Sequence, residues 1–175
     1  LLHSGSTPLV LDADALNALA AEPDTLVGGD RAVIITPHPG EMSRLATRST
    51  ADVQSDRLAA ARQFAVDHQV HVVLKGAGTI VASPGGNTWL NLTGNPGMAT
   101  AGVGDVLTGV VAAWLAQTGE ADAACQLGVY LHGLAGDLAS DAHGEVALIA
   151  SDVIDKLGEA VVETAESANS DLGDR

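Results

Sequence analysis

The chain reads GNPGMATAGVGDVLTG from Gly94 to Gly109, with five glycines in sixteen residues and a single acid, Asp105. Glycine has no Cβ, so the backbone can adopt left-handed angles here and lie close against a ligand. The apolar residues that follow recur at helical spacing, which predicts a helix that begins near Gly104. A helix N-terminus offers unpaired amides and the positive end of its dipole. We therefore expect an anion such as a phosphoryl group to bind at this junction.

The composition predicts one α/β domain over residues 1–175. The chain is 46% hydrophobic, and about 100 to 200 residues are usual for one domain. Only 2% of the residues are aromatic, so Ala, Val, Leu and Gly must build the core. Small side chains of this kind suit helices that pack closely on a sheet.

Charge and cysteine content argue against several classes of protein. The 22 acids and 8 bases give a net charge of −14, which opposes binding to nucleic acid or to an anionic membrane. Cys125 is the only cysteine, so neither a disulfide framework nor a Cys-based zinc site is expected. No apolar run reaches the roughly 18 residues of a membrane span, and the first residues do not show a basic segment followed by an apolar one. We expect a cytoplasmic protein.

Apolar runs typical of strands alternate with helical patterns through the first half of the chain. We expect strands at 9–11, 32–35 and 70–74 and helices at 13–21, 41–46 and 51–68. This alternation indicates βαβ units and a mainly parallel sheet flanked by helices. The runs at 79–82 and 88–92 are joined by SPGGN, which predicts an antiparallel hairpin at one edge. Beyond the hairpin we expect helices at 105–117, 121–140 and 151–166, then a frayed tail at 167–175.

Polar segments follow the three predicted parallel strands directly: DADALN, TPHPGE and KGAGT. Ligands of open α/β sheets bind outside the carboxyl ends of the strands, so we expect these loops to meet at one site. Each loop alone has a plainer explanation. Asp12 and Asp14 can cap a helix, and His38 can be an exposed turn residue. Glu41 can be a first-turn acid favoured by the helix dipole, and Lys75 can be a surface amine.

The remaining motifs are weaker evidence for a function. GxxxxGK[ST] is absent, and GVGDVLTG does not satisfy GxGxxG. His68 and His71 have HxxH spacing without an accompanying acid or cysteine pattern, so we interpret them as residues at a helix end. His132 and Tyr130 lie in a predicted helix rich in Leu and Ala, and we interpret them as packing or interface residues.

The chain resembles the ADP- or ATP-dependent NAD(P)H-hydrate dehydratases of the ribokinase-like superfamily in four segments, which in order read VLDADALNAL, TPHPGE, LKGAGT and GNPGMATAGVGDVLTG. The resemblance covers about Leu9 to Ser140, and the glycine-rich segment is its most specific part. It implies a ribokinase-like α/β fold. That family's domain is longer and begins with further strands and helices, so we expect this chain to be a partial domain that lacks its N-terminal part.

The resemblance also implies a reaction that repairs nicotinamide cofactors. The family converts the S form of NADHX or NADPHX, which are cofactors damaged by addition of water, back to NADH or NADPH. A nucleotide phosphorylates the hydroxyl group, and phosphate then leaves. The implied phosphoryl donor is ADP, or ATP, together with Mg²⁺.

The same resemblance implies roles for individual residues. Asp105 would be the catalytic base that accepts the hydroxyl proton, and His38 and Asp105 would contact the hydrated cofactor. The charge on the transferring phosphoryl group would be stabilised by the amides of Ala101, Gly102, Val103 and Gly104. The nucleotide would be contacted by Lys75, Gly76, Ala77, Gly78, Thr79 and Gly104. Glu41 matches the Glu of an Asn-x-x-Glu pattern associated with magnesium in related sugar kinases, although His38 stands in place of the Asn.

Two alternative functions remain open. One is a metabolite kinase of the same superfamily that phosphorylates a small alcohol, although TPHPGE and GNPGMATAG match the dehydratases more closely. The other is an inactive nucleotide-binding or assembly fragment. The partners we expect are the hydrated cofactor, further copies of the chain in a homo-oligomer, and an NAD(P)HX epimerase that is fused or separate.

Overall fold

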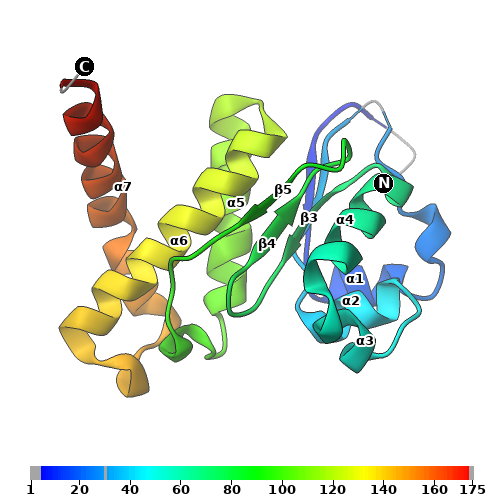
Figure 1. Cartoon of the computed structure of the whole chain (residues 1–175), viewed down its shortest axis with the longest axis horizontal. Coiled ribbons are helices and arrows are strands. Elements are labelled where there is room, and N and C mark those ends of the chain that lie inside the picture. The colour runs from blue at the N-terminus through cyan, green and yellow to red at the C-terminus, as the bar shows by residue number, and fades with distance from the viewer. Residues whose placement is uncertain (1–4, 30, 174–175) are drawn as a thin grey trace.

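A single sheet forms the centre of the molecule in the computed structural model, which describes residues 5–29 and 31–173 (Figure 1). Strands β1 (Leu9–Leu11), β2 (Val33–Ile35) and β3 (His71–Leu74) pair in parallel. Strands β4 (Ile80–Ala82) and β5 (Thr88–Leu90) continue the sheet in antiparallel fashion, in the order β1-β2-β3-β4-β5. The predicted α/β class, the mainly parallel sheet and the hairpin at one edge are therefore confirmed.

Four helices cover one face of the sheet. They are α1 (Asp14–Leu19), α2 (Pro39–Leu45), α3 (Thr50–Ser55) and α4 (Arg57–His68). Side chains alternate between the two faces along a strand, so β2, β3 and β4 each supply this core with every second residue. The fully buried side chains between these helices and the sheet include Leu16, Ile35, Met42, Val53, Ala61, Val72 and Leu74.

The prediction of a single helix over 51–68 is wrong. The segment forms two helices, α3 and α4, which are separated at Asp56. The backbone of Asp56 has φ −148° and ψ 78°, outside the helical region. Its carboxylate accepts a hydrogen bond from the amide of Ala59 at 2.9 Å and so caps α4. A short polar side chain that bonds to nearby backbone competes with a continuous helix in this way. The periodicity of the apolar residues continues across the break and does not reveal it.

Helices α5 (Val103–Thr118) and α6 (Ala121–His143) cover the opposite face. Ile34 and Val73, which alternate with the residues of the first core, point to this side. Buried residues of α5 and α6 complete this second core, namely Leu107, Val111, Leu115, Ala121, Ala124, Cys125 and Val129. The observed bounds contain the predicted ranges 105–117 and 121–140.

Helix α7 (Ala150–Gly173) packs against α6 on the side away from the sheet (Figure 1). The contact between them is made by small and branched residues such as Leu131, Ala135, Val153 and Ala160. The helix continues through residue 173, so most of the tail that we expected to fray at 167–175 is helical. Residues 174 and 175 lie outside the described part.

Short 3-10 helices, η1 (Pro23–Thr25), η2 (Pro96–Met98) and η3 (Glu145–Ala147), lie in the connections. None of the helices within the described residues is both long enough and apolar enough to cross a membrane.

Candidate active site at the start of α5

Polar side chains at the carboxyl ends of the parallel strands meet one helix at a single point. Asp12 follows β1 and Lys75 follows β3, and the Lys75 Nζ lies 2.8 Å from the Asp12 Oδ1. Thr108 of α5 donates a hydrogen bond to the Asp12 Oδ2 at 2.7 Å. Thr36, which follows β2, lies with its hydroxyl oxygen 3.3 Å from that of Thr108. The loops after the first three strands therefore meet at one edge of the sheet, as predicted.

Asp12 is held in its ionised form by these contacts. Burial by itself would raise the pKa of the Asp12 carboxyl, but the hydrogen bonds from Lys75 and Thr108 and the charge of Lys75 outweigh it, so the pKa lies below its usual value. The side chain of Asp12 is only 8% exposed. Asp12 therefore acts as a fixed anion that orients the Lys75 ammonium.

Replacing Asp12 with Asn is expected to lower the free energy of unfolding at neutral pH by about 1 kcal/mol. A hydrogen bond to a charged group contributes roughly 1.5–3 kcal/mol when buried, and partial exposure reduces this. Because the folded-state pKa is lowered, the contribution is present above the ordinary carboxyl pKa and is lost as pH falls through the folded-state value. Urea unfolding near pH 7 and near pH 3 measures it. Asp14→Asn, at the exposed first turn of α1, is the control, and an equal loss there would contradict the assignment.

His38 begins helix α2 and is tied to Glu41 by a reciprocal capping box. The amides of Gly40 and Glu41 donate to the His38 Nδ1 at 3.0 and 3.3 Å, and the His38 amide donates to the Glu41 Oε2 at 2.8 Å. Since Nδ1 accepts hydrogen bonds, it carries no proton, and Nε2 holds the proton of the neutral ring. The His38 side chain is 52% exposed, so it is accessible to a ligand.

Glu41 links His38 to Lys75. Its carboxylate is 6% exposed and lies 3.8 Å from the Lys75 Nζ. It is therefore both the first-turn acid that we considered and a second anion beside the lysine. No group of three or more His, Cys, Asp or Glu side chains that could hold a metal ion occurs among the described residues. In this structure Glu41 contacts His38 and Lys75.

Helix α5 begins at the glycine pair that the sequence singled out. Gly102 is the residue before the helix, with φ +86°, a conformation that glycine adopts without strain. The first bond of the helix runs from the Val106 amide to the Gly102 carbonyl at 3.1 Å. The amides of the first turn, from Val103 to Asp105, therefore have no acceptor within the helix. Ala101 lies in the turn just before this cap.

The lysine amine lies against this first turn. A Cβ built on Gly104 would lie 3.4 Å from the Lys75 Nζ, so a larger side chain at position 104 would press on the amine. Asp105 is the next residue and is exposed. The structure thus brings the Lys75 amine against Gly104, whose neighbour in the chain is Asp105, and through Glu41 it connects His38 to the same lysine.

The loop after β3, residues 75–79, runs beside these groups. The Lys75 amide donates to the Pro37 carbonyl at 2.9 Å, which ties this loop to TPHPGE. Gly76 and Gly78 have φ values of +144° and +64°, so both positions favour glycine. The Thr79 hydroxyl donates to the Gly76 carbonyl at 3.2 Å.

His132 of α6 forms a hydrogen bond to the first turn of α5 on its buried side. The sequence did not reveal this role. His132 is 7% exposed, and its Nε2 lies 3.0 Å from the Val103 carbonyl oxygen. Because a carbonyl only accepts, Nε2 carries the proton. Burial, with a smaller contribution from the charge of Lys75, lowers the pKa of His132 to about 4. The interpretation of His132 as a packing residue agrees with this burial, whereas Tyr130 is 40% exposed.

The first part of the glycine-rich stretch serves as a structural anchor. Asp137 of α6 accepts hydrogen bonds from the Gly94 amide at 2.8 Å and from the Asn95 side-chain amide at 3.0 Å. A Cβ on Gly97 would lie 2.9 Å from the Glu145 Cα, which the backbone does not permit. The packing on η3 thus explains the glycine at position 97, and the φ of +99° favours glycine at position 94.

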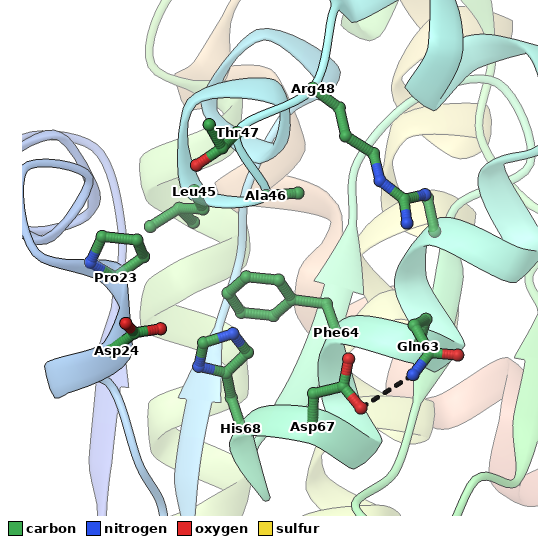
Figure 2. Close-up of a pocket in the computed structure, with 11 residues that line it drawn as sticks. Pro23, Asp24, Leu45, Ala46, Thr47, Arg48, Gln63, Phe64, Asp67 and His68 are labelled. Carbon is green, nitrogen blue, oxygen red and sulfur yellow. Dashed lines mark hydrogen bonds between the residues drawn. The ribbon is translucent and has the colours of Figure 1, made fainter.

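A separate shallow pocket of about 180 Å³ lies between α2, α4 and η1 (Figure 2). Phe64 and His68 stack in it with ring centroids 4.0 Å apart, and Gln63 donates to Asp67 at 2.7 Å. None of the residues predicted for the site lines this pocket. The pocket is therefore a feature of the helical face and is separate from the junction at α5.

A family model described as NAD(P)H-hydrate dehydratase matches residues 2–159. The chain belongs to this family. It is 48% identical over 157 residues to the bifunctional NAD(P)H-hydrate repair enzyme Nnr of Moorella thermoacetica, covering 90% of this chain and 30% of that protein. It is 44% identical over 149 residues to the ADP-dependent (S)-NAD(P)H-hydrate dehydratase of Neisseria meningitidis, covering 83% of this chain and 50% of that protein.

Solved structures of family members agree with the fold. The ADP/ATP-dependent NAD(P)H-hydrate dehydratase from Bacillus subtilis, co-crystallised with ATP/Mg²⁺ and soaked with CoA, superposes with a TM-score of 0.81 at 33% identity. That match covers 91% of this chain and 57% of the Bacillus chain. A ribokinase-like superfamily protein from Enterococcus faecalis superposes with a TM-score of 0.70 at 28% identity, covering 89% of this chain and 52% of that one. The fold is therefore ribokinase-like, and the chain spans about a third to a little over half of the relatives it matches.

Proposed function

We propose that this chain carries the phosphoryl-transfer centre of an NAD(P)H-hydrate dehydratase, which uses ADP, or ATP, to return S-NADHX or S-NADPHX to NADH or NADPH. The observation that carries the proposal is the position of the Lys75 amine against Gly104, at the amide-rich start of α5 and beside Asp105. Family membership and the names of the Neisseria and Bacillus relatives support the same reaction.

The first step of the proposed reaction makes a leaving group. Hydroxide is a poor leaving group, so the hydroxyl must first be converted into a phosphate ester. To do this, the hydroxyl oxygen of the hydrated ring attacks the terminal phosphorus of the nucleotide. Asp105 accepts the hydroxyl proton, which a base must do from within hydrogen-bond distance. The bond from the terminal phosphorus to the bridging oxygen breaks, and ADP becomes AMP.

The start of α5 would stabilise the charge in this step. Amides that already point at the transferring group do not have to reorganise, so their stabilisation of the transition state is large. We assign this role to the segment from Ala101 to Gly104, where helix geometry favours the amides of the first turn most strongly. The Lys75 ammonium, oriented by Asp12 and Glu41, adds a positive charge at the same place.

The second step restores the ring. The phosphate leaves with the electron pair of the C–O bond, and the neighbouring ring carbon loses a proton, so the double bond forms again. The sum is S-NADHX plus ADP giving NADH, AMP and phosphate. His38 has a half-exposed side chain, its Nδ1 accepts hydrogen bonds from two amides, and its Nε2 lies 3.5 Å from the Glu41 Oε1. We assign it to bind and orient the hydrated cofactor.

The remaining assignments concern the nucleotide and the partners. We assign nucleotide contacts to residues 75–79 and to Gly104, since this loop and this glycine flank the proposed phosphoryl site. The Bacillus relative was co-crystallised with ATP/Mg²⁺, which supports a metal that arrives with the nucleotide phosphates.

Because only one epimer reacts, we also propose that an epimerase, fused or separate, works with the enzyme. The bifunctional name of the Moorella relative supports this.

The reaction is tested by mixing S-NADHX with ADP and recording the absorbance band of reduced nicotinamide. The assay uses this chain and, in parallel, the complete protein that carries this sequence, and AMP and phosphate are measured with NADH. Equal amounts of the three products support the proposal. If the complete protein forms AMP from ADP and a small alcohol but no NADH from S-NADHX, the chain belongs to a kinase and the proposal fails.

A further inference from the structure

Arg57 places its guanidinium inside the loop that follows β3. Its Nη1 donates to the Ala77 carbonyl at 2.6 Å, and its Nη2 donates to the carbonyls of Leu74 and Lys75 at 3.1 and 3.3 Å. One side chain on α4 therefore bonds to the carbonyl of the last residue of β3 and to two carbonyls of the loop that follows it, 17 to 20 residues further along the chain. No other described side chain bonds to as many of this loop's carbonyls.

The loop closes tightly around the guanidinium. A Cβ built on Gly76 would lie 2.9 Å from the Arg57 Nη2, so a side chain at position 76 would displace the guanidinium. Lysine at position 57 would offer a single ammonium, whereas arginine has a planar fork of five donors. The arginine and the two positive-φ glycines, Gly76 and Gly78, together determine the course of the loop.

The carbonyl contacts also orient the amides of the loop. The described residues contain no cis peptide bond, and in a trans peptide the C=O and the N–H of the next residue point in opposite directions. The carbonyls of Lys75 and Ala77 point at Arg57. The N–H groups of Gly76 and Gly78 therefore point away from it, and neither has an acceptor within the described part of the chain.

We propose that Arg57 is a positioning residue for nucleotide binding. It holds the loop so that the amides of Gly76 and Gly78 donate hydrogen bonds to acceptor atoms of an adenosine nucleotide. Arg57 acts through its hydrogen bonds to the three carbonyls. It does not itself contact the nucleotide. This inference rests on the proposed function, because it assumes that the loop binds ADP or ATP.

The test compares Arg57→Met and Arg57→Lys with Arg62→Met. Arg62 is the matched control because it lies on the same helix and donates to the Gly86 carbonyl at 3.0 Å, in the turn between β4 and β5. Calorimetry with ADP and steady-state kinetics on the complete protein give the Kd, KM and kcat. We expect Arg57→Met to raise the Kd and KM for ADP about tenfold, the effect of losing about 1.4 kcal/mol of binding. The kcat at saturating ADP and the KM for S-NADHX should stay within about twofold.

Arg57→Lys should recover only a small part of the ADP affinity, and Arg62→Met should bind ADP as the wild type does. Hydrogen exchange provides a readout that does not need catalysis: the amides of Lys75 and Asn91, which donate to the Pro37 and Thr79 carbonyls, should exchange faster in Arg57→Met while those of β2 keep their protection. Faster exchange in both segments would mean general destabilisation and would overturn the inference.

The two proposals fail in different ways. If the wild type binds ADP and makes NADH but Arg57→Met binds ADP equally well, the inference on Arg57 is wrong and the proposed function stands. If the wild-type protein does not bind ADP at all, the proposed function fails, and the nucleotide role of Arg57 fails with it.

Discussion

Asp105→Asn is expected to lower the kcat for NADH formation by about 10²- to 10⁴-fold, the usual contribution of a general base. Asparagine keeps the size of the side chain in the first turn of α5 but cannot accept the hydroxyl proton. Because Asp105 is exposed, the variant should fold as the wild type does. The loss should fall mainly on kcat, since Asp105 acts on the substrate hydroxyl and the nucleotide contacts lie elsewhere.

Measurement requires saturating ADP and S-NADHX and the complete protein. Asp155→Asn, which removes an equally exposed carboxylate from α7, controls for the change in net charge and should leave the kcat unchanged. A kcat for Asp105→Asn within about threefold of the wild type would show that another group takes the proton, because a threefold change corresponds to less than 1 kcal/mol of barrier.

Acid should destabilise the folded chain through His132, with a loss of about 2 kcal/mol between pH 7.5 and pH 5. The buried imidazole has a pKa of about 4, against an ordinary value of 6.5. The unfolded state therefore binds a proton at higher pH than the folded state. The stabilisation from His132 is complete above about pH 7, falls as pH drops through 6.5, and levels off near pH 4.

The matched variants are His132→Gln and His143→Gln. Glutamine at position 132 retains an N–H donor for the Val103 carbonyl but does not titrate, so this variant should lose most of the pH dependence over that range. His143 is exposed on the same helix, and its replacement should leave the dependence intact. Urea unfolding at each pH gives the free energies, and an unchanged pH dependence in His132→Gln would contradict the role assigned to this histidine.

The predictions for Asp105 and His132 concern opposite sides of the first turn of α5. Asp105 faces outward in the first turn of α5, and His132 bonds to the Val103 carbonyl at the buried side of that turn. Protonation of His132 would remove the basis for its burial and loosen the start of the helix.

Much of the fold could be predicted because its signals are local. The strand at 9–11 matched the structure in full, and the hairpin followed from the glycine-rich turn SPGGN between two apolar runs. The break at Asp56 could not be predicted from periodicity, since apolar spacing is the same on both sides of it. The tail beyond residue 166 is polar, yet it continues α7 to Gly173.

The candidate site was predictable as a set of loops but not as a set of contacts. The position of the glycine junction, and of His38 and Lys75 after their strands, could be read from the residues alone. The capping of α2 by His38 could not, because His is an uncommon capping residue. The glycine-rich stretch was treated as one junction, whereas its first part is anchored elsewhere, because Gly97 packs against Glu145 and the Gly94 amide donates to Asp137.

The sequence by itself determined the α/β class, the mainly parallel sheet and the approximate start of helix α5, since hydrophobic period and glycine position act over a few residues. Only the tertiary structure decided which polar groups meet there. Lys75 bonds to Asp12 across 63 residues, and Thr108 bonds to Asp12 across 96. Contacts at such separations depend on how helices pack on the sheet, and no local pattern encodes them. For the same reason Arg57 emerged as part of the site only from the folded chain.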